Sequence, residues 1–163
     1  MERIDKDNYY LDIAQTVLER STCIRRMYGA IIVRNDEIVS SGYNGAPRGR
    51  ANCVDLGYCI REKLHIPSGE RYELCRSVHA EANAIISAAR RDMLGGTLYL
   101  VGRDARTGEL HAHAESCPMC KRQIINAGIA RVVVRVTPTE YTVTDVRQWI
   151  EDDDSIRDEN YVL

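Results

Sequence analysis

The sequence HAE at residues 79–81 and the sequence CPMC at residues 117–120 carry the strongest signal in this chain. Cys117 and Cys120 are one helical turn apart, so their thiols project from the same side of a helix start. Pro118 suits the first turn of that helix, because its missing N–H would have no partner there. Thiolates at a helix N-terminus face the positive end of the helix dipole, which lowers their pKa and favours metal binding. CPMC therefore predicts two metal ligands at the start of a helix.

His79 supplies a third ligand. A neutral imidazole and two thiolates leave one position of a tetrahedral Zn²⁺ for water, which is the arrangement of a catalytic zinc. Zn²⁺ lowers the pKa of its water toward about 7, and the carboxylate of Glu81 can take that proton and deliver it elsewhere. Residues two apart do not share a face of a helix, so we expect His79 at the helix start.

Each half of this pattern has an ordinary explanation when it stands alone. A lone His-x-Glu is mostly chance, and a lone Cys-x-x-Cys fits a redox pair or half of a structural zinc site. Neither explanation accounts for the two halves together, each opening a helix. The combined arrangement is close to the pattern of zinc-dependent deaminases. We therefore predict a catalytic zinc held by His79, Cys117 and Cys120, with Glu81 as the catalytic proton carrier.

Length, charge and composition narrow the class of protein. The 163 residues suffice for one domain, and 44% hydrophobic and 28% charged residues are ordinary for a soluble globular protein. A net charge of −2 argues against a broad contact with nucleic acid. No segment has the length of a membrane span, and the N-terminal residues lack the layout of a signal peptide. We predict a cytoplasmic protein that binds neither membrane nor nucleic acid, with thiols or metal-bound cysteines rather than disulfides.

Apolar periodicity and turn residues predict an α/β fold in which helices cover an antiparallel hairpin joined to parallel strands. The expected elements are a helix over 7–20, strands over 29–34 and 37–43, a short helix near 53–64, a helix from about 78, a strand over 97–101, a helix over 117–127, and strands over 131–136 and 141–146 before a short helix around Trp149. Asn35-Asp36 is expected to form the hairpin turn and Gly128 a helix cap.

Three further expectations concern burial and loops. The helix from about 78 should bury Ala84, Ile85, Ala88 and Ala89. Residues 45–78 form an irregular link of a length that is usually functional or braced. Residues 102–116 are expected to form a polar loop, and the acidic residues 152–154 a solvated surface.

Beyond the metal motif, the sequence resembles the deoxycytidylate (dCMP) deaminase family of the cytidine deaminase-like superfamily. The shared stretches run in order between about residues 7 and 136: Cys23-x-Arg25, GAIIV at 29–33, GYNGAP at 42–47, HAEANAI at 79–85, Cys117-x-x-Cys120 and IINAGI at 124–129. The resemblance implies a three-layer αβα sandwich around a mixed sheet of about five strands, as a single zinc-dependent deaminase domain over 1–163. It also implies hydrolytic deamination of dCMP to dUMP and ammonia, which feeds thymidylate synthesis, with Glu81 protonating N3 and the departing ammonia.

The resemblance assigns substrate contacts as well. Asn44 matches the asparagine expected to hold the deoxyribose, and main chain near Ala80 and Cys117 is placed to bond the edges of the base. Arg25 and Arg26 lie where a ligand for the 5′-phosphate is needed, although plain surface charge would also explain two adjacent arginines.

Family members use the GYNG region in a separate site for regulatory dCTP and dTTP, usually in a hexamer. The corresponding candidates here are Tyr43, Gly45, Arg48 and Arg50, with Mg²⁺ as the partner of a bound triphosphate. The resemblance therefore implies a homo-oligomer whose activity responds to dCTP and dTTP.

Four cysteines remain outside the catalytic motif. Cys23, Cys53, Cys59 and Cys75 correspond to positions where bacterial and phage relatives carry a second, structural zinc. A four-cysteine site is closed to substrate and would brace residues 45–78. The alternatives are four reduced, partly buried thiols, or a zinc with fewer than four cysteine ligands.

The loop over 102–116 is longer than relatives have, and Ser116 stands where they commonly have proline. Serine is a good N-cap, so we expect Ser116 to cap the following helix. The loop should overhang the substrate pocket, with His111 and His113 either solvated or bound to metal. Other functions left open are deamination of dCTP or another cytosine nucleotide, deamination of tRNA adenosine on the same fold, and a non-enzymatic zinc- or nucleotide-binding subunit.

Overall fold

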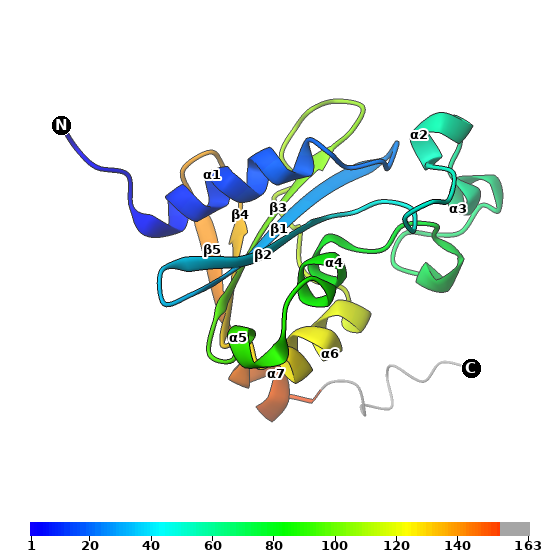
Figure 1. Ribbon diagram of the computed structural model, residues 1–163. Helices are drawn as coiled ribbons and strands as arrows, with labels where there is room; N and C mark the ends of the chain where they lie inside the picture. The colour runs from blue at the N-terminus through cyan, green and yellow to red at the C-terminus, as the bar shows by residue number, and fades with distance from the viewer. Residues whose placement is uncertain (154–163) are drawn as a thin grey trace.

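The computed structural model describes residues 1–153, which form a five-stranded mixed sheet with helices on both faces (Figure 1). The strands lie in the order β2-β1-β3-β4-β5. Their bounds are Arg26–Arg34 for β1, Glu37–Tyr43 for β2, Thr97–Asp104 for β3, Arg131–Arg135 for β4 and Tyr141–Asp145 for β5. β1 is antiparallel to β2 and β3, β3 is parallel to β4, and β4 is antiparallel to β5. The expected mixed sheet of about five strands is confirmed.

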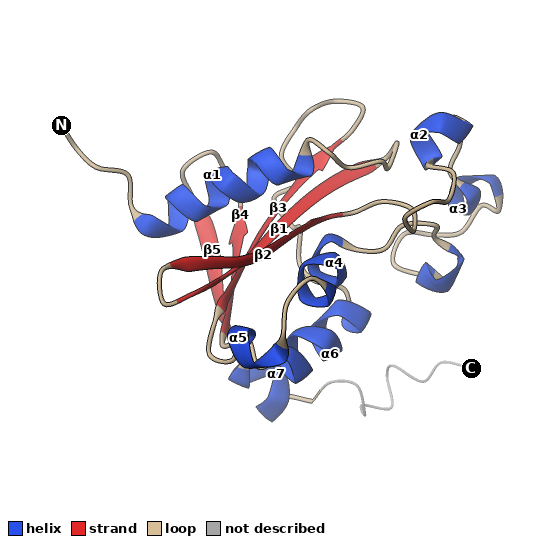
Figure 2. Cartoon of the chain, viewed as in Figure 1, coloured by secondary structure: helices blue, strands red, loops and turns tan. Residues whose placement is uncertain are grey.

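Helices cover the two faces of this sheet unequally (Figure 2). The helical segments are α1 (Lys6–Leu18), α2 (Cys53–Leu56), α3 (Ile60–Lys63), the 3₁₀ turn η1 (Tyr72–Leu74), α4 (Ala80–Ile86), α5 (Arg90–Met93), α6 (Pro118–Ala127) and α7 (Arg147–Glu151). α1 packs on one face, and α4 and α6 pack on the other. No helix within residues 1–153 combines the length and apolar character that crossing a membrane requires.

The two layers of core follow the alternation of side chains along the strands. Ile31 and Val133 are buried under α1, whereas their neighbours Ile32 and Val134 are buried under α4 and α6. A strand that is covered on both faces needs apolar residues at every position, and this is why the central strands read as continuous apolar runs.

The β1–β2 hairpin turns at Asn35 and Asp36, as predicted. Both residues have left-handed backbone, with φ of 51° and 62°, as a type I′ turn requires and as these residue types tolerate. The carboxylate of Asp36 accepts hydrogen bonds from the Tyr10 hydroxyl and the Lys6 ammonium group. The turn therefore also ties the first helix to the edge of the sheet.

Two helix predictions need correction. In place of one short helix near 53–64 there are two single-turn helices, because Gly57 takes a left-handed conformation (φ 75°) and ends α2. α4 stops at Ile86, so Ala89 is exposed as the cap of α5 and not buried as predicted. Ala84 is fully buried, and Ile85 and Ala88 pack partly buried against the core.

The strand predicted over 97–101 is longer than expected. Gly102 and Arg103 still pair with Tyr28 and Met27 of β1, so the following loop begins only after Asp104. Residues 152 and 153 are exposed, in agreement with the expected solvated surface, and residue 154 lies outside the described residues.

Gly42 allows α4 to pack directly on β2. A Cβ at this position would clash with the backbone of Ala80 and Ala84, which no side-chain rotation can relieve. We expect Gly42→Ala to lower the free energy of unfolding by about 2 kcal/mol or more. Because α4 begins with a predicted zinc ligand, its displacement should weaken zinc binding as well. Thermal unfolding and competition with a chelator measure the two effects.

Gly29 provides the matched control. A Cβ there would clash with the backbone of α1, at Ala14 and Leu18, on the opposite face of the sheet. Gly29→Ala should destabilise the fold to a similar degree, and the folded fraction should keep its zinc affinity. Equal loss of zinc affinity in both variants would contradict this account.

Candidate active site

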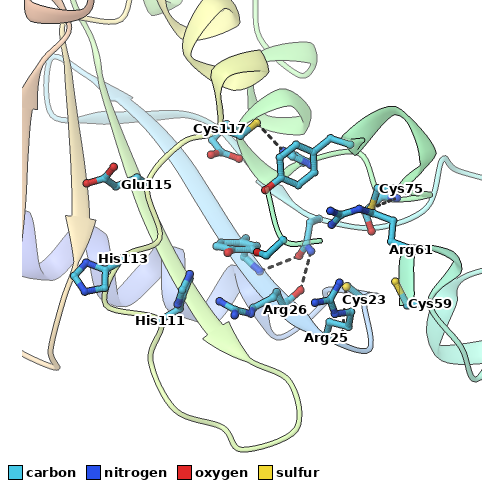
Figure 3. Close-up of a pocket in the computed structure, with 17 residues that line it drawn as sticks. Cys23, Arg25, Arg26, Cys59, Arg61, Cys75, His111, His113, Glu115 and Cys117 are labelled. Atoms are coloured by element: carbon cyan, nitrogen blue, oxygen red, sulfur yellow. Dashed lines mark hydrogen bonds between the residues drawn. The ribbon is translucent and has the colours of Figure 1, made fainter. Parts of the chain in front are cut away.

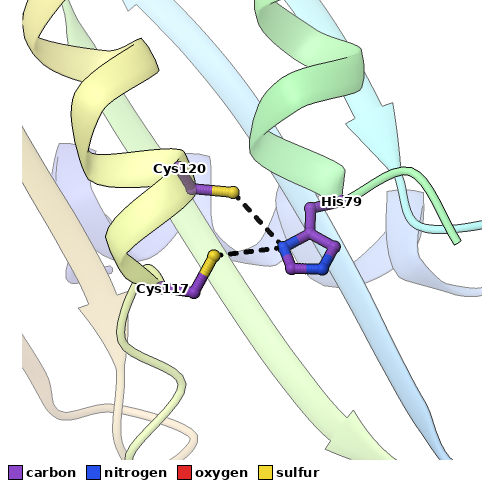
Figure 4. A group of neighbouring side chains, drawn as sticks. All are labelled: His79, Cys117 and Cys120. Carbon is purple, nitrogen blue, oxygen red and sulfur yellow. Dashed lines mark hydrogen bonds between the residues drawn. The ribbon is translucent and has the colours of Figure 1, made fainter. Parts of the chain in front are cut away.

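The helices α4 and α6 begin at the same edge of the sheet. β2 and β3 are both antiparallel to β1, so they end at one edge, and the chain enters α4 and α6 from there. His79 is the N-cap of α4 and Cys117 is the N-cap of α6, both with extended backbone. Pro118 occupies the first turn of α6, as expected. The fold thus brings two distant parts of the sequence together (Figure 4).

The three predicted zinc ligands meet at metal-binding distances. His79 Nδ1 lies 3.4 Å from Cys117 Sγ and 3.3 Å from Cys120 Sγ. Bonds of about 2.0–2.3 Å to one tetrahedral ion would separate such donors by about 3.5 Å, so the arrangement fits Zn²⁺. Within residues 1–153, this is the one group of three His, Cys, Asp or Glu side chains close enough to share a metal ion.

The two thiols are electrostatically unequal. A hydrogen bond from the Cys120 thiol, helped by His79, lowers the pKa of Cys117 to about 4. The same contact with Cys117, together with burial, raises the pKa of Cys120. Cys117 Sγ and Cys120 Sγ therefore share one proton in a hydrogen bond. A divalent cation that replaces it would satisfy both sulfurs as thiolates, which is the chemistry of a zinc site.

Glu81 lies in the first turn of α4, beside the ligands, with 5% of its surface exposed. Burial raises the pKa of its carboxyl group, and hydrogen bonds to the carboxylate oppose that rise. The Ser116 hydroxyl donates one of these bonds, over 3.0 Å to Glu81 Oε1. The prediction that Ser116 caps the following helix is wrong, because Cys117 is the cap. Ser116 instead donates a hydrogen bond to Glu81, the predicted proton carrier.

A cavity of about 290 Å³ opens in front of these groups (Figure 3). His79, Glu81 and Cys117 form one wall. Arg25 and Arg26, the two residues predicted to bind a phosphate, line it as well. A pocket that joins a metal site, a buried carboxyl group and several cations is suited to a small polar anion.

Asn44 also lines the cavity, but its carboxamide is largely used by the protein. Its oxygen accepts hydrogen bonds from the Tyr28 amide (2.8 Å) and the Ser21 hydroxyl (2.6 Å), and its nitrogen donates to the Arg26 carbonyl (2.8 Å). An asparagine offers two donors and two acceptor positions. One N–H is therefore left for a ligand.

The two predicted phosphate arginines differ in their contacts. Arg25 pairs with Glu62 (2.9 Å), which also pairs with Arg106 (3.1 Å) in the loop after β3. Arg26 forms no ion pair within residues 1–153 and lies next to the Tyr28 and His111 side chains. Arg26 is thus the more available cation of the two.

The loop after β3 overhangs the cavity, as expected. His111 packs edge-on against Tyr28, and both His111 and His113 line the cavity, but neither belongs to a metal-binding group within residues 1–153. Burial, with help from Arg26, lowers the pKa of His111, so the ring is neutral near pH 7. Ala114 anchors the loop because it is buried against the core.

The four remaining cysteines gather on the opposite side of the cavity. Burial raises the pKa of Cys53, and the charges of the other three thiols add to that rise. Those three, Cys23, Cys59 and Cys75, line the cavity. The thiols thus influence one another electrostatically, but no three of them lie as close together as the donor atoms of the His79 group.

The residues predicted for an effector site are mainly exposed. Tyr43 is the exposed last residue of β2, and Arg48 and Arg50 lie on the surface beyond it. Gly45 is buried and pairs with Val78 through both backbone hydrogen bonds. This pairing fixes the chain just before His79. Ala80 is fully buried in the first turn of α4. The prediction for this residue is that its main chain, and not its side chain, bonds the edge of the base.

Arg61 and Tyr72 line the cavity and were not predicted from the sequence. The Arg61 guanidinium lies 4.8 Å from the centre of the Tyr72 ring, and that ring meets the His79 imidazole edge-on at 5.6 Å. Both come from the irregular residues 45–78, whose path no periodicity reveals. Arg61 and Arg71 both lie between Cys59 and Cys75 in the sequence, so sequence position alone does not single out Arg61.

Residues 4–136 match the family model described as cytidine and deoxycytidylate deaminase zinc-binding region. The deoxycytidylate deaminase of Mycobacterium phage D29 is 37% identical over 138 residues, covering 82% of this chain and 96% of the relative. The deoxycytidylate deaminase of Schizosaccharomyces pombe is 32% identical over 129 residues, covering 78% of this chain and 36% of the yeast protein.

Among solved structures, the dCMP deaminase of the cyanophage S-TIM5 in complex with dCMP and dUMP superposes with a TM-score of 0.56 at 25% identity. The match covers 83% of this chain and 84% of that one. At this coverage the agreement in fold is not confined to the metal motif.

Proposed function

This chain belongs to the family of cytidine and deoxycytidylate deaminases, and we propose that it hydrolyses dCMP to dUMP and ammonia. The observation that carries this proposal is the meeting of His79, Cys117 and Cys120 beside the buried carboxyl group of Glu81. Three ligands and an adjacent proton carrier suit hydrolysis rather than a structural role. The phage relative and the dCMP-bound structural neighbour support the substrate.

Zinc bound here would supply a water of lowered pKa next to C4 of the cytosine ring. Glu81 would accept the first proton of the attacking water and pass it to N3 of the base. It then carries the second proton to the 4-amino group, which leaves as ammonia as the C4 carbonyl of dUMP forms. Ser116 keeps Oε1 of Glu81 in place during both transfers, and burial keeps bulk water from competing for the protons.

The remaining substrate contacts are proposed from the lining of the cavity. The one N–H of Asn44 that the protein does not use would hold the deoxyribose hydroxyl, and main chain at Ala80 and Cys117 would bond the base edge. Arg26 would contact the 5′-phosphate, with Arg25 beside it. Support comes from their position around the cavity that contains Glu81.

Ultraviolet monitoring of dCMP, dCTP, deoxycytidine and a tRNA as substrates tests the function. We expect dCMP to be consumed fastest, with a requirement for zinc. Faster turnover of dCTP would favour a different cytosine nucleotide, and reaction with tRNA alone would favour an adenosine deaminase of the same fold. No turnover of any of them by the zinc-loaded protein would favour a non-enzymatic subunit.

Replacing Ser116 by Ala should move the pH profile of the reaction. The hydrogen bond from Ser116 favours the charged carboxylate and so lowers the pKa of Glu81. Without it that pKa rises, and the carboxylate needed as base is lost at a higher pH. We expect the acidic limb of kcat/KM to shift upward, with the alkaline limb unchanged. A downward shift would contradict the assigned role.

A second, structural zinc at Cys23, Cys53, Cys59 and Cys75 is proposed for the same domain, which we take to span 1–163 with 45–78 as a zinc-braced insertion. Support comes from the electrostatic effect of Cys23, Cys59 and Cys75 on Cys53 and from the position of those three in the wall of one cavity. Metal analysis should find two zinc ions per chain. Cys53→Ser should reduce this to one and leave the His79 site loaded. One zinc per chain in the unaltered protein would reject the second site.

The quaternary and regulatory features follow from family membership. We propose a cytoplasmic homo-oligomer, a hexamer by resemblance, with a regulatory site for dCTP or dTTP and Mg²⁺ around Tyr43, Gly45, Arg48 and Arg50. The exposure of the two arginines is compatible with a phosphate contact. Light scattering, and rates measured with and without dCTP and dTTP, test the two statements separately.

A further inference from the structure

Arg61 is the most deeply buried cation in the wall of the active-site cavity. Only 6% of its surface is exposed. One terminal nitrogen donates to the backbone carbonyls of Pro67 (2.9 Å) and Glu70 (2.6 Å). Its Nε–H is buried without a hydrogen-bond partner in the described residues. The carbonyl contacts therefore position the guanidinium without using all of its donors.

No carboxylate is in direct contact with Arg61 within residues 1–153, although its charge, after the larger effect of Arg71, helps to lower the pKa of Glu73. The structure gives it no ion pair, although three glutamates lie in the same segment. Glu62 and Glu73 pair with other arginines, and Glu70 offers its carbonyl rather than its carboxylate. Burying an arginine without a counter-charge is costly. Such a residue in a cavity wall therefore fits an anion-binding group.

Arg61 and the predicted zinc ligand His79 both contact the ring of Tyr72. Tyr72 lies between them, 4.8 Å from the guanidinium and 5.6 Å from the His79 ring, measured to its ring centre. Figure 3 shows Arg61 facing the cavity across from Arg26. A base seated at the zinc has its 5′-phosphate at the far end of the molecule. Arg61 lines the same cavity and is separated from the His79 ring by Tyr72, so it is a candidate to meet that phosphate.

We propose that Arg61 binds the 5′-phosphate of the substrate and is a specificity-determining residue for nucleotides over nucleosides. The inference rests on the proposed deamination of a cytosine nucleotide. Tyr72 holds the guanidinium by cation–π contact and separates it from the imidazole, so that the base and the phosphate bind in distinct places. Arg26 approaches from the opposite wall, and the two cations together would enclose the phosphate.

The test compares dCMP with deoxycytidine, which lacks the phosphate, in Arg61→Gln and Arg61→Lys. For Arg61→Gln we expect kcat/KM for dCMP to fall by about a hundredfold or more, with the value for deoxycytidine within about threefold of the unaltered protein. Arg61→Lys keeps the charge without the planar fork and should fall by about tenfold. Arg71→Gln is the matched control. It removes an exposed arginine of the same segment and should change neither value.

A purely structural role predicts a different result. If Arg61 only holds residues 67–70, both substrates should lose rate equally, and this outcome overturns the proposal. Should Arg61→Gln fail to fold in a thermal unfolding assay, the ratio of the two substrates in Arg61→Lys decides. Should the unaltered protein deaminate neither substrate, the proposed function fails. The anion site is then judged by calorimetric titration with dUMP and deoxyuridine, where a preference for dUMP lost in Arg61→Lys supports it and an unchanged preference rejects it.

Discussion

Replacing Glu81 by Gln is expected to lower kcat by about a thousandfold or more while zinc stays bound. The amide keeps the size of the side chain and can still accept a bond from Ser116, but it cannot take a proton from the metal-bound water. Both proton transfers of the reaction pass through this residue, so the substitution should block both of them and lower kcat. None of the three zinc ligands is altered.

Zinc content by atomic emission and steady-state kinetics with dCMP check this expectation. Glu109→Gln is the control, because it makes the same chemical change at an exposed position outside the cavity. It should retain full activity. Near-normal turnover by Glu81→Gln would contradict the mechanism, and loss of zinc in that variant would show that Glu81 acts through the metal site instead.

Replacing Cys120 by Ala should remove the catalytic zinc and reduce activity below detection. Cys120 is buried between α4 and α6, and two protein ligands cannot hold Zn²⁺ tightly. The bound metal stabilises the folded state because the unfolded chain lacks the site. The melting temperature should therefore fall, and the unaltered protein treated with a chelator should fall toward the same value.

Met119→Ala is the matched control for that experiment. Met119 neighbours Cys120 on α6 but is not a ligand, so the variant should retain its zinc and its rate. The decisive measurement is the zinc content, which should be one ion per chain lower in Cys120→Ala than in Met119→Ala. Equal zinc content and equal activity in the two variants would contradict the assigned ligand set.

The metal centre and the central sheet could be predicted because their signals are local. The ligands are identified by residue type and spacing, and each begins a helix where backbone geometry is predictable. The hairpin follows from Asn35-Asp36, whose side chains tolerate left-handed backbone. Continuous apolar runs mark strands covered on both faces. None of these inferences needs knowledge of distant contacts.

Other features depend on contacts that no local pattern encodes. Ser116 has the composition of a helix cap, yet it bonds a carboxylate far away in the sequence. Ala89 continues an apolar pattern, but the helix ends before reaching it. Arg61 belongs to a helix of four residues, too short for periodicity, and its burial follows from the path of 45–78. The three hydrogen bonds that the Asn44 carboxamide forms within the protein likewise depend on tertiary contacts.

The loop between β3 and α6 has two fixed ends, and the position of neither end depends on the length of the loop. Strand pairing with β1 fixes where it departs, and the core contacts of α6 fix where it returns. Segments of other lengths could therefore be grafted between Asp104 and Ala114, which leaves the buried Ala114 and the bond from Ser116 to Glu81 in place. Libraries varied in this stretch would be a practical starting point for redirecting such an enzyme toward modified cytosines.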